Sequence, residues 1–182
     1  MYTSLQNRVA KTLVGVGVTS ILTGIVLASC VSGGNPTATP AALGTPSPQE
    51  IAAYAQLADD ETLARGRQIY TQYCASCHGI NGEGQFPDSY DYIDPATGKH
   101  GAAPQDETGH TMHHDDDLLY WYIMNGGVAK PEESYPMPGY SGILSDENVL
   151  DVIAFIKSLW TQEQRYMQAD TTLTIRRQNQ ER

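Results

Sequence analysis

The chain has 182 residues, which suffices for one domain of ordinary size with extra segments but not for two full domains with separate cores. Its 11 basic and 21 acidic residues give a formal net charge of −10. Such an acidic field disfavours nucleic-acid binding and favours a positively charged partner surface, although an acidic surface can also serve solubility alone.

An export segment is predicted at the N-terminus. Arg8 and Lys11 precede residues 12–29, which carry no charge and are rich in Val, Leu, Ile and Gly. The run ends in LASC, which resembles the lipobox of bacterial lipoproteins and implies that residues 1–29 are removed and that Cys30 carries a lipid anchor. The alternative is an uncleaved membrane helix, because residues rising about 1.5 Å each would span roughly 27 Å. Both alternatives place the rest of the chain on the outer, periplasmic face of the bacterial cytoplasmic membrane.

Residues 30–49 have the composition of a flexible tether. After Cys30 the segment consists mainly of Gly, Ser, Thr and Ala, with four prolines. Such a composition cannot bury enough apolar area to offset the entropy lost on ordering. We expect the tether either to let an anchored domain move between partners or to act as a passive spacer.

A helical pattern begins at Pro48, and a second one begins near Asp60 and continues into the sequence CASCHG. Two thiols separated by two residues can reach both vinyl groups on one edge of a porphyrin and form thioethers. The next residue then presents its imidazole to the iron. The spacing of Cys74, Cys77 and His78 therefore predicts one covalently bound haem c with His78 as an axial ligand.

Other uses of Cys74 and Cys77 agree less well with the sequence. A thioredoxin-like redox pair needs a preceding strand, whereas the pattern before Cys74 is helical. A zinc site needs further ligands at regular spacing, and the chain holds only three cysteines. A structural disulfide across two intervening residues is strained.

The residues around this motif resemble a class I cytochrome c over about residues 58–162. The resemblance rests on Gly66, Tyr70, the CASCHG motif, the sequence MPGY at 137–140 and a closing amphipathic helix that ends in Leu159-Trp160. It implies an all-α fold with helices and long loops around one haem, in a domain at residues 50–162. It also implies that Gly66 lets an aromatic residue of the last helix, Phe155 or Trp160, approach closely.

A long irregular segment, residues 80–117, follows the motif and is rich in Gly, Asp, Pro and Tyr. We expect it to be a loop around the haem edge. The family resemblance implies that the carbonyl of Pro104 accepts the imidazole N–H of His78, a bond that fixes the tautomer and strengthens donation to iron. Pro87 and Pro95 in the same segment are alternatives.

The sequence GHTMHH within this segment groups several metal-binding side chains, namely His110, Met112, His113 and His114. They could hold a second metal or supply an alternative axial ligand. The other interpretation is a polar turn before a helix at about 116–125, with His114 or Asp115 as its N-cap.

Met137 is the best candidate for the sixth iron ligand. It lies in the sequence YPMP, whose prolines exclude a helix or a central strand, so a stiff extended loop would present the thioether. A thioether is a soft ligand that favours reduced iron and raises the redox potential. Weaker candidates are Met112, Met124 and Met167, and Met137 could also simply pack within its loop.

The last predicted helix begins after Ser145, and its apolar residues recur at helical spacing up to Trp160. They are expected to form core. The family fold is complete at this point. Residues 163–182 are polar and contain four arginines, and we expect this extension to be disordered or to dock on a partner.

Together these features predict a membrane-anchored carrier that transfers single electrons in a respiratory or photosynthetic chain and is not itself an enzyme. The lipobox, tether and tail resemble the monohaem lipoprotein subunit of alternative complex III, a bacterial quinol oxidoreductase. This implies other redox proteins or the subunits of such a complex as partners. The alternative is a haem c enzyme, such as a peroxidase, with a displaceable sixth ligand and distal groups from the three histidines of GHTMHH.

Overall fold

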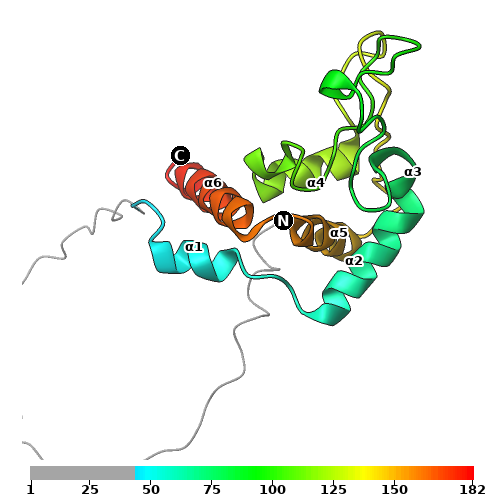
Figure 1. The fold of residues 1–182 in the computed structure, drawn as a ribbon. Coiled ribbons are helices and arrows are strands. Elements are labelled where there is room, and N and C mark those ends of the chain that lie inside the picture. Colours follow the sequence, from blue (N-terminus) through cyan, green and yellow to red (C-terminus); the bar gives the residue numbers. More distant parts are fainter. Residues whose placement is uncertain (1–43) are drawn as a thin grey trace, which may run out of the picture. The chain divides into compact units, whose positions relative to one another are not determined.

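The computed structural model describes residues 44–182, so the predicted export segment 1–29, the anchor Cys30 and the tether up to residue 43 lie outside the described residues. Within 44–182 the secondary structure is helical, with isolated β-bridges and no strand (Figure 1). The elements are α1 (Pro48–Tyr54), α2 (Asp60–Tyr73), α3 (Ala75–His78), η2 (Tyr90–Tyr92), η3 (Thr111–His113), α4 (Asp116–Asn125), α5 (Asp146–Ser158) and α6 (Gln162–Gln180). The predicted all-α fold class is confirmed. In the described part of the chain, no helix combines the length and the hydropathy needed to cross a membrane.

The helices begin at capping residues, of which Asp115 and Ser145 were predicted from the sequence. Ser47 accepts a hydrogen bond from the Glu50 N–H, and the Glu50 carboxylate accepts one from the Ser47 N–H, which forms a capping box at α1. Asp115, and not His114, caps α4, because its carboxylate accepts from two backbone N–H groups of the first turn. Ser145 caps α5 in the same way as Ser47 caps α1.

Helices α2 and α5 cross at close range at Gly66. A Cβ atom at this position would lie 2.0 Å from the Asp151 carbonyl oxygen and 2.9 Å from the Phe155 Cβ. Only glycine therefore fits the crossing. The expected approach of an aromatic residue to Gly66 is confirmed with Phe155 as that residue, and the ring of Phe155 also lies 5.1 Å from the ring of Tyr70.

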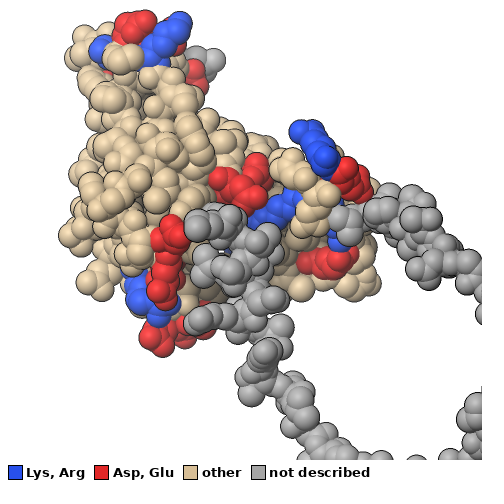
Figure 2. All heavy atoms as spheres, turned by 180° about the vertical axis from the view of Figure 1, so that it is seen from behind, with Lys and Arg blue, Asp and Glu red and all other residues tan. Residues whose placement is uncertain are grey.

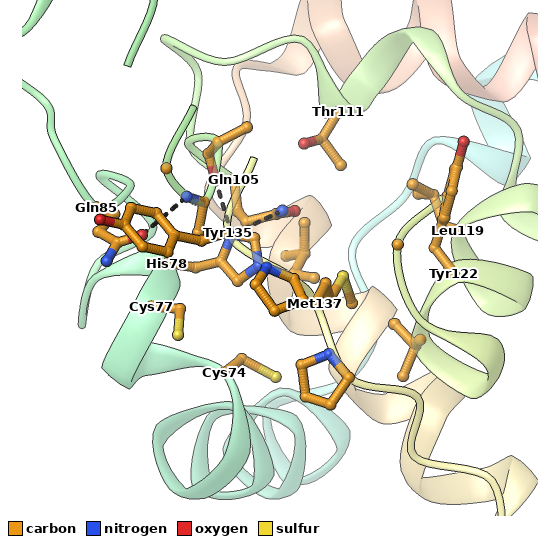
Figure 3. A pocket seen from close by; sticks show the side chains of 18 of the residues that line it. Cys74, Cys77, His78, Gln85, Gln105, Thr111, Leu119, Tyr122, Tyr135 and Met137 are labelled. Atoms are coloured by element: carbon orange, nitrogen blue, oxygen red, sulfur yellow. Dashed lines mark hydrogen bonds between the residues drawn. The ribbon is translucent and has the colours of Figure 1, made fainter. Parts of the chain in front are cut away.

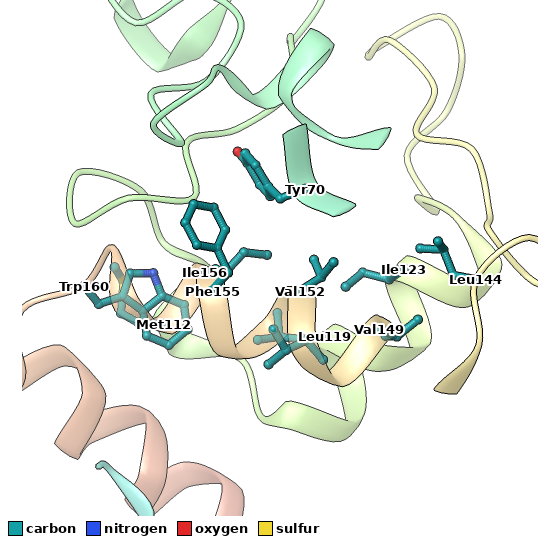
Figure 4. Packing of buried hydrophobic residues seen from close by; sticks show 11 residues of the cluster. Tyr70, Met112, Leu119, Ile123, Leu144, Val149, Val152, Phe155, Ile156 and Trp160 are labelled. Atoms are coloured by element: carbon teal, nitrogen blue, oxygen red, sulfur yellow. The ribbon is translucent and has the colours of Figure 1, made fainter. Parts of the chain in front are cut away.

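The core follows one stripe of α5. Figure 4 shows the α5 side chains packed between Tyr70 of α2 on one side and Leu119 and Ile123 of α4 on the other. The buried apolar residues of α5 are Val149, Val152, Ile153, Phe155 and Ile156, and the buried Trp160 follows two residues after the helix ends. Each such side chain contributes about 1.5–3 kcal/mol by leaving water. This apolar packing fixes α2 and therefore the motif at its C-terminal end.

Residues 162–180 of the C-terminal extension form the helix α6, so the expected disorder is wrong, and docking on a partner stays a prediction. α6 begins after its cap Thr161 and lies against α1 and η3. Polar side chains of α6 also reach the first turn of α4: the Gln168 amide donates to the Asp116 carboxylate at 2.6 Å, and Arg176 pairs with Asp117 at 2.8 Å. Because these side chains are polar, the hydrophobic periodicity of the sequence gave no sign of the contact.

Asp116 joins four helices through its carboxylate. It accepts hydrogen bonds from the Tyr54 hydroxyl at 2.6 Å and from Gln168, and it pairs with Lys157 at 2.7 Å. Burial acts to raise the pKa of Asp116, but the attraction of Lys157 and these hydrogen bonds outweigh burial and lower it. Removal of one of these partners would leave a buried carboxylate without full compensation and would therefore destabilise the fold.

The charged groups are unevenly distributed over the surface. On the face shown in Figure 2, acidic and basic side chains gather in mixed groups, and a broad area of this face carries no charge.

Candidate functional site

One cavity of about 470 Å³ brings together the four residues that the sequence predicts to hold a haem. Cys74 ends α2, Cys77 and His78 lie in α3, and Met137 reaches the cavity from the loop between α4 and α5 (Figure 3). The rest of the lining is mostly apolar or aromatic and includes Leu119, Tyr122, Ile123, Val152 and Ile156. The volume falls within the about 300–1,000 Å³ typical of cofactor sites.

The two thiols are free and suited to bonding with another group. Neither Cys74 nor Cys77 forms a disulfide. Burial, with the neighbouring Cys77 thiol as a smaller cause, raises the pKa of the Cys74 thiol to about 11. A reactive redox thiol needs the opposite shift, toward the thiolate. The helix before Cys74 and the raised pKa therefore both argue against a thioredoxin-like pair.

His78 is held in one tautomer by the backbone. Its Nδ1 lies 2.8 Å from the Ala103 carbonyl oxygen, so Nδ1 carries the proton and donates, and Nε2 keeps its lone pair. Burial lowers the pKa of His78, although the bond to Ala103 acts in the opposite direction. The ring is therefore a neutral imidazole with one nitrogen free to bind a metal.

The expectation that Pro104 accepts this bond is wrong by one residue. The Pro104 carbonyl accepts from the Thr111 hydroxyl at 3.3 Å instead. Proline still explains the geometry, because it forces the preceding residue into extended backbone and so fixes the direction of the Ala103 carbonyl. Pro104 acts on His78 through its neighbour.

Gln105 and Trp160 support this loop, and sequence reasoning did not identify them as part of the site. The Trp160 Nε1–H donates to the Gln105 carbonyl at 2.8 Å, and the Gln105 N–H donates to the Gly82 carbonyl at 2.7 Å. The Gln105 side-chain amide lies 3.2 Å from His78 Nδ1. Trp160 is only 3% exposed, and a buried indole N–H needs an acceptor. That need was readable from the sequence, but the identity of the acceptor was not.

Two tyrosine hydroxyls fix the backbone around the motif. The Tyr70 hydroxyl, which is fully buried, donates to the Gly79 carbonyl at 3.1 Å. The Tyr140 hydroxyl donates to the Tyr73 carbonyl at 2.7 Å and so joins the Met137 loop to the end of α2. The position of the motif is therefore set by the helix before it and by the loop across from it.

Met137 rests on the C-terminus of α4. Its carbonyl accepts from the Gly127 N–H at 3.0 Å, and a Cβ atom at Gly126, which has φ +92, would lie 2.7 Å from that carbonyl. The three alternative methionines do not line the cavity: Met112 is buried in the core, Met124 packs against it, and Met167 is exposed on α6. The geometry therefore favours Met137 over the other three methionines.

The histidine cluster does not form a metal site. His110 and His114 line the cavity with ring centroids 5.5 Å apart, whereas His113 is exposed and does not line it. Residues 44–182 contain no group of three or more His, Cys, Asp or Glu side chains placed to hold a metal ion. Burial, and then the neighbouring His110, lowers the pKa of His114.

Comparison with known proteins points to one family. Residues 63–160 match the family model described as "Cytochrome c". The chain is 32% identical over 120 residues, 63% of its length, to a thiosulfate dehydrogenase of Stutzerimonas stutzeri. It is 31% identical over 102 residues, 52% of its length, to the cytochrome c subunit of an alcohol dehydrogenase (quinone) of Gluconacetobacter polyoxogenes, and equally similar to that of Komagataeibacter europaeus.

These matches cover only part of the relatives. The aligned region is 34% of the thiosulfate dehydrogenase and 18% of each alcohol dehydrogenase subunit. No solved structure matches the chain.

Proposed function

The chain belongs to the cytochrome c family, and from this premise we propose that it is a membrane-anchored carrier of single electrons with one haem c. Membership of the family makes it an electron-transfer protein that binds haem c covalently. The observation that carries the finer proposal is the shared cavity of Cys74, Cys77, His78 and Met137. In this proposal the two thiols form the thioethers, and His78 and Met137 are the axial ligands.

Haem c, when bound, supplies an iron that alternates between the ferric and ferrous states. The protein's part is to hold that iron in one coordination geometry. The Ala103 carbonyl orients His78 so that Nε2 is presented as a neutral donor. Met137 adds a soft thioether, which stabilises the ferrous state and raises the redox potential. With His78 and Met137 both holding the iron, no coordination position would be left for a substrate.

The proposed location is the outer face of the bacterial cytoplasmic membrane, with Cys30 as the lipid anchor and the predicted tether at residues 30–49, of which Pro48 and Gln49 already lie in α1. The sequence at Cys30 supports the anchor. A tethered carrier would meet its redox partners at a high local concentration.

The proposed partners are other redox proteins or the subunits of a quinol-oxidising complex of the alternative complex III type. The relatives support assembly with an oxidoreductase, because two of them are named as the cytochrome subunit of a quinone-linked dehydrogenase. Gentle detergent extraction followed by native gel electrophoresis tests this proposal. Migration of the haem protein with other subunits supports a complex, and migration alone contradicts a permanent one.

Two measurements on the membrane-extracted protein test the core proposal. Intact mass spectrometry should show the mass of one haem and of acyl chains on a mature chain that begins at Cys30. The ferric spectrum should be low-spin, with the weak red-edge band of methionine-to-iron charge transfer. Two free thiols at Cys74 and Cys77 and no Soret absorption would contradict the proposal.

A haem c enzyme is the second candidate, and one observation favours it. His110 and His114 line the same cavity as His78, where they could act as acid or base groups beside a displaceable ligand. The match to a thiosulfate dehydrogenase is compatible with this candidate. A high-spin ferric spectrum in the purified protein would favour the enzyme over the carrier.

A further inference from the structure

Two loops that are far apart in the sequence, one around residue 100 and the other just before Met137, contact each other. Figure 1 shows them in green and yellow, extending side by side away from the helices. The His100 N–H donates to the Glu133 carbonyl at 2.9 Å, and the Tyr135 N–H donates to the His100 carbonyl at 2.9 Å. We call residues 94–100 and 131–135 together the loop junction.

A nearly buried carboxylate lies at the centre of the loop junction. Asp94 is 9% exposed and accepts hydrogen bonds from the Tyr135 hydroxyl at 2.6 Å, the Thr97 hydroxyl at 2.8 Å and the Ala96 N–H at 2.8 Å. The bond from Tyr135, followed by those from Ala96 and Thr97, lowers the pKa of Asp94. Bonds to an ionised carboxylate are shorter and stronger than neutral ones.

Further contacts hold Tyr135 and its neighbours in place. The Lys99 ammonium donates to the Pro131 carbonyl at 2.6 Å and lies 6.0 Å from the centre of the Tyr135 ring. The Tyr135 ring also lies 6.4 Å from the ring of Phe86. Tyr135 also lines the cavity itself, so the loop junction reaches the site.

The first loop adopts an unfavourable backbone to reach this position. Asp91 and Tyr92 have φ values of 54 and 55, in the left-handed region that non-glycine residues rarely occupy. Such conformations persist where the surrounding contacts determine them, and they gather at functional sites. The Gly101 N–H, next to the loop junction, donates to the Tyr92 carbonyl at 2.9 Å and is a contact of this kind.

The chain between Tyr135 and Met137 is short and stiff. Pro136 and Pro138 fix their own φ and restrict the residues before them, so a displacement of Tyr135 moves Met137 with it. On the far side, the Met137 carbonyl is held by the Gly127 N–H. Met137 is therefore held by the stiff chain that joins it to Tyr135 and by the hydrogen bond from Gly127.

We propose that Asp94 and Tyr135 are positioning residues that hold the Met137 thioether in place for the iron. This inference rests on the proposed function, because it takes Met137 as the sixth ligand. The loop at residues 85–101 then has a definite use, since it supports an axial ligand through a contact 41 residues away in sequence.

The test uses the full-length ferric holoprotein with the substitutions Tyr135→Phe and Asp94→Asn. Imidazole is titrated as an external ligand that competes with Met137, and the methionine-to-iron band is followed. We expect imidazole to bind about tenfold more tightly in each variant, which corresponds to about 1.4 kcal/mol, the order of one hydrogen bond to a charged group. The double variant should resemble Tyr135→Phe, because Asp94→Asn takes the charge from the bond that Tyr135→Phe removes altogether.

The matched control is Tyr92→Phe. The Tyr92 hydroxyl donates to the Thr108 carbonyl at 3.2 Å, so this substitution also removes a tyrosine hydroxyl bond from the first loop but leaves the bond between Asp94 and Tyr135 intact. Imidazole affinity should stay within about twofold of the wild type in this variant. In Tyr135→Phe, amide hydrogen exchange should be faster at the non-proline residues of 133–137. Exchange in α5 should be unchanged, and this would show that the fold is intact.

Two failures can be told apart. If the wild type shows the methionine band and the Tyr135→Phe and Asp94→Asn variants bind imidazole as the wild type does, the positioning role is wrong and Met137 remains the ligand. If the wild type lacks the band and binds imidazole as Met137→Ala does, the ligand assignment itself is wrong and the inference falls with it.

Discussion

The cavity has two sides that are held in place by different forces. Cys74, Cys77 and His78 stand at the end of α2, whose crossing with α5 is closed by buried side chains around Gly66 and Phe155. We call this side the helical wall. The other side, the loop wall at residues 126–138, is irregular backbone. Hydrogen bonds join it to α4 and to residues 94–100 of the loop junction.

The two walls therefore differ in how easily each could release a bound group. Apolar burial over a helix crossing is lost only when the whole domain unfolds, whereas a hydrogen-bonded loop can open locally at a much smaller cost in free energy. The helical wall is therefore suited to permanent attachment. The loop wall is suited to a ligand whose bond can be adjusted or displaced.

The largest expected effect is the loss of attachment at the helical wall. In Cys74→Ala combined with Cys77→Ala, no thioether can form, and haem should separate from the chain in denaturant. Mass spectrometry after denaturation measures this directly. The matched control is Cys30→Ala, which should keep the haem but no longer sediment with the membrane fraction. Haem that stays on the double variant after denaturation would show that the attachment lies elsewhere.

Met137→Ala should leave attachment intact and change the redox potential. Loss of the thioether should lower the potential by a considerable part of the about 0.8 V that axial ligands span. Potentiometric titration followed in the visible spectrum measures the shift. Met167→Leu is the control, because Met167 is exposed on α6 and does not line the cavity. A potential equal to that of the wild type would remove Met137 from the iron.

Gly66→Ala should weaken the helical wall without altering the loop wall. The added methyl group would overlap the Asp151 carbonyl oxygen. Alanine by itself stabilises a helix by about 1 kcal/mol relative to glycine, but the overlap outweighs this gain, so the free energy of unfolding should show a net fall of about 1–3 kcal/mol. Denaturant titration measures the change, and the exposed Gln68→Ala in the same helix is the control. The methionine band should be unchanged in the folded protein. An unchanged midpoint would mean that the crossing is looser than described.

The smallest effect is a release of the loop wall in acid. Hydrogen bonds, first from Tyr135, hold the pKa of Asp94 below its ordinary value of about 3.9. The ionised form therefore stabilises the loop junction fully above about pH 4, and this contribution is lost as the pH falls through the lowered pKa. The methionine band should weaken before the far-ultraviolet circular dichroism changes. Asp94→Asn should remove this acid step, and a step that persists in Asp94→Asn would assign it to another group.

Much of the helical wall could be predicted from the sequence. The helix caps Asp115 and Ser145 and the apolar stripe of α5 depend on neighbours in sequence or on a regular helical repeat, whereas the approach of an aromatic residue to Gly66 followed from the resemblance to class I cytochromes c. Local rules of this kind need no knowledge of the rest of the fold. The motif at the end of α2 follows from the same helix.

The loop wall and α6 could not be predicted in the same way. The bond between Asp94 and Tyr135 and the contacts of α6 with Asp116 and Asp117 join polar residues far apart in sequence, and polar pairing has no period. The bond of His78 to the Ala103 carbonyl, where the Pro104 carbonyl was expected, shows a related limit. Sequence located the proline that shapes the turn, but only the backbone shows which carbonyl faces the imidazole.

The proximity of the two ends of the described chain has a practical consequence. Arg177 of α6 donates to the Gly44 carbonyl at 2.9 Å and pairs with Glu50 of α1 at 2.5 Å, and neither helix contributes to the cavity lining. A short peptide joining the end of α6 to Gly44 should therefore permit circular permutation, with new termini opened in an exposed turn. Affinity tags or electrode linkers attached beyond either helix should likewise leave access to the cofactor unchanged.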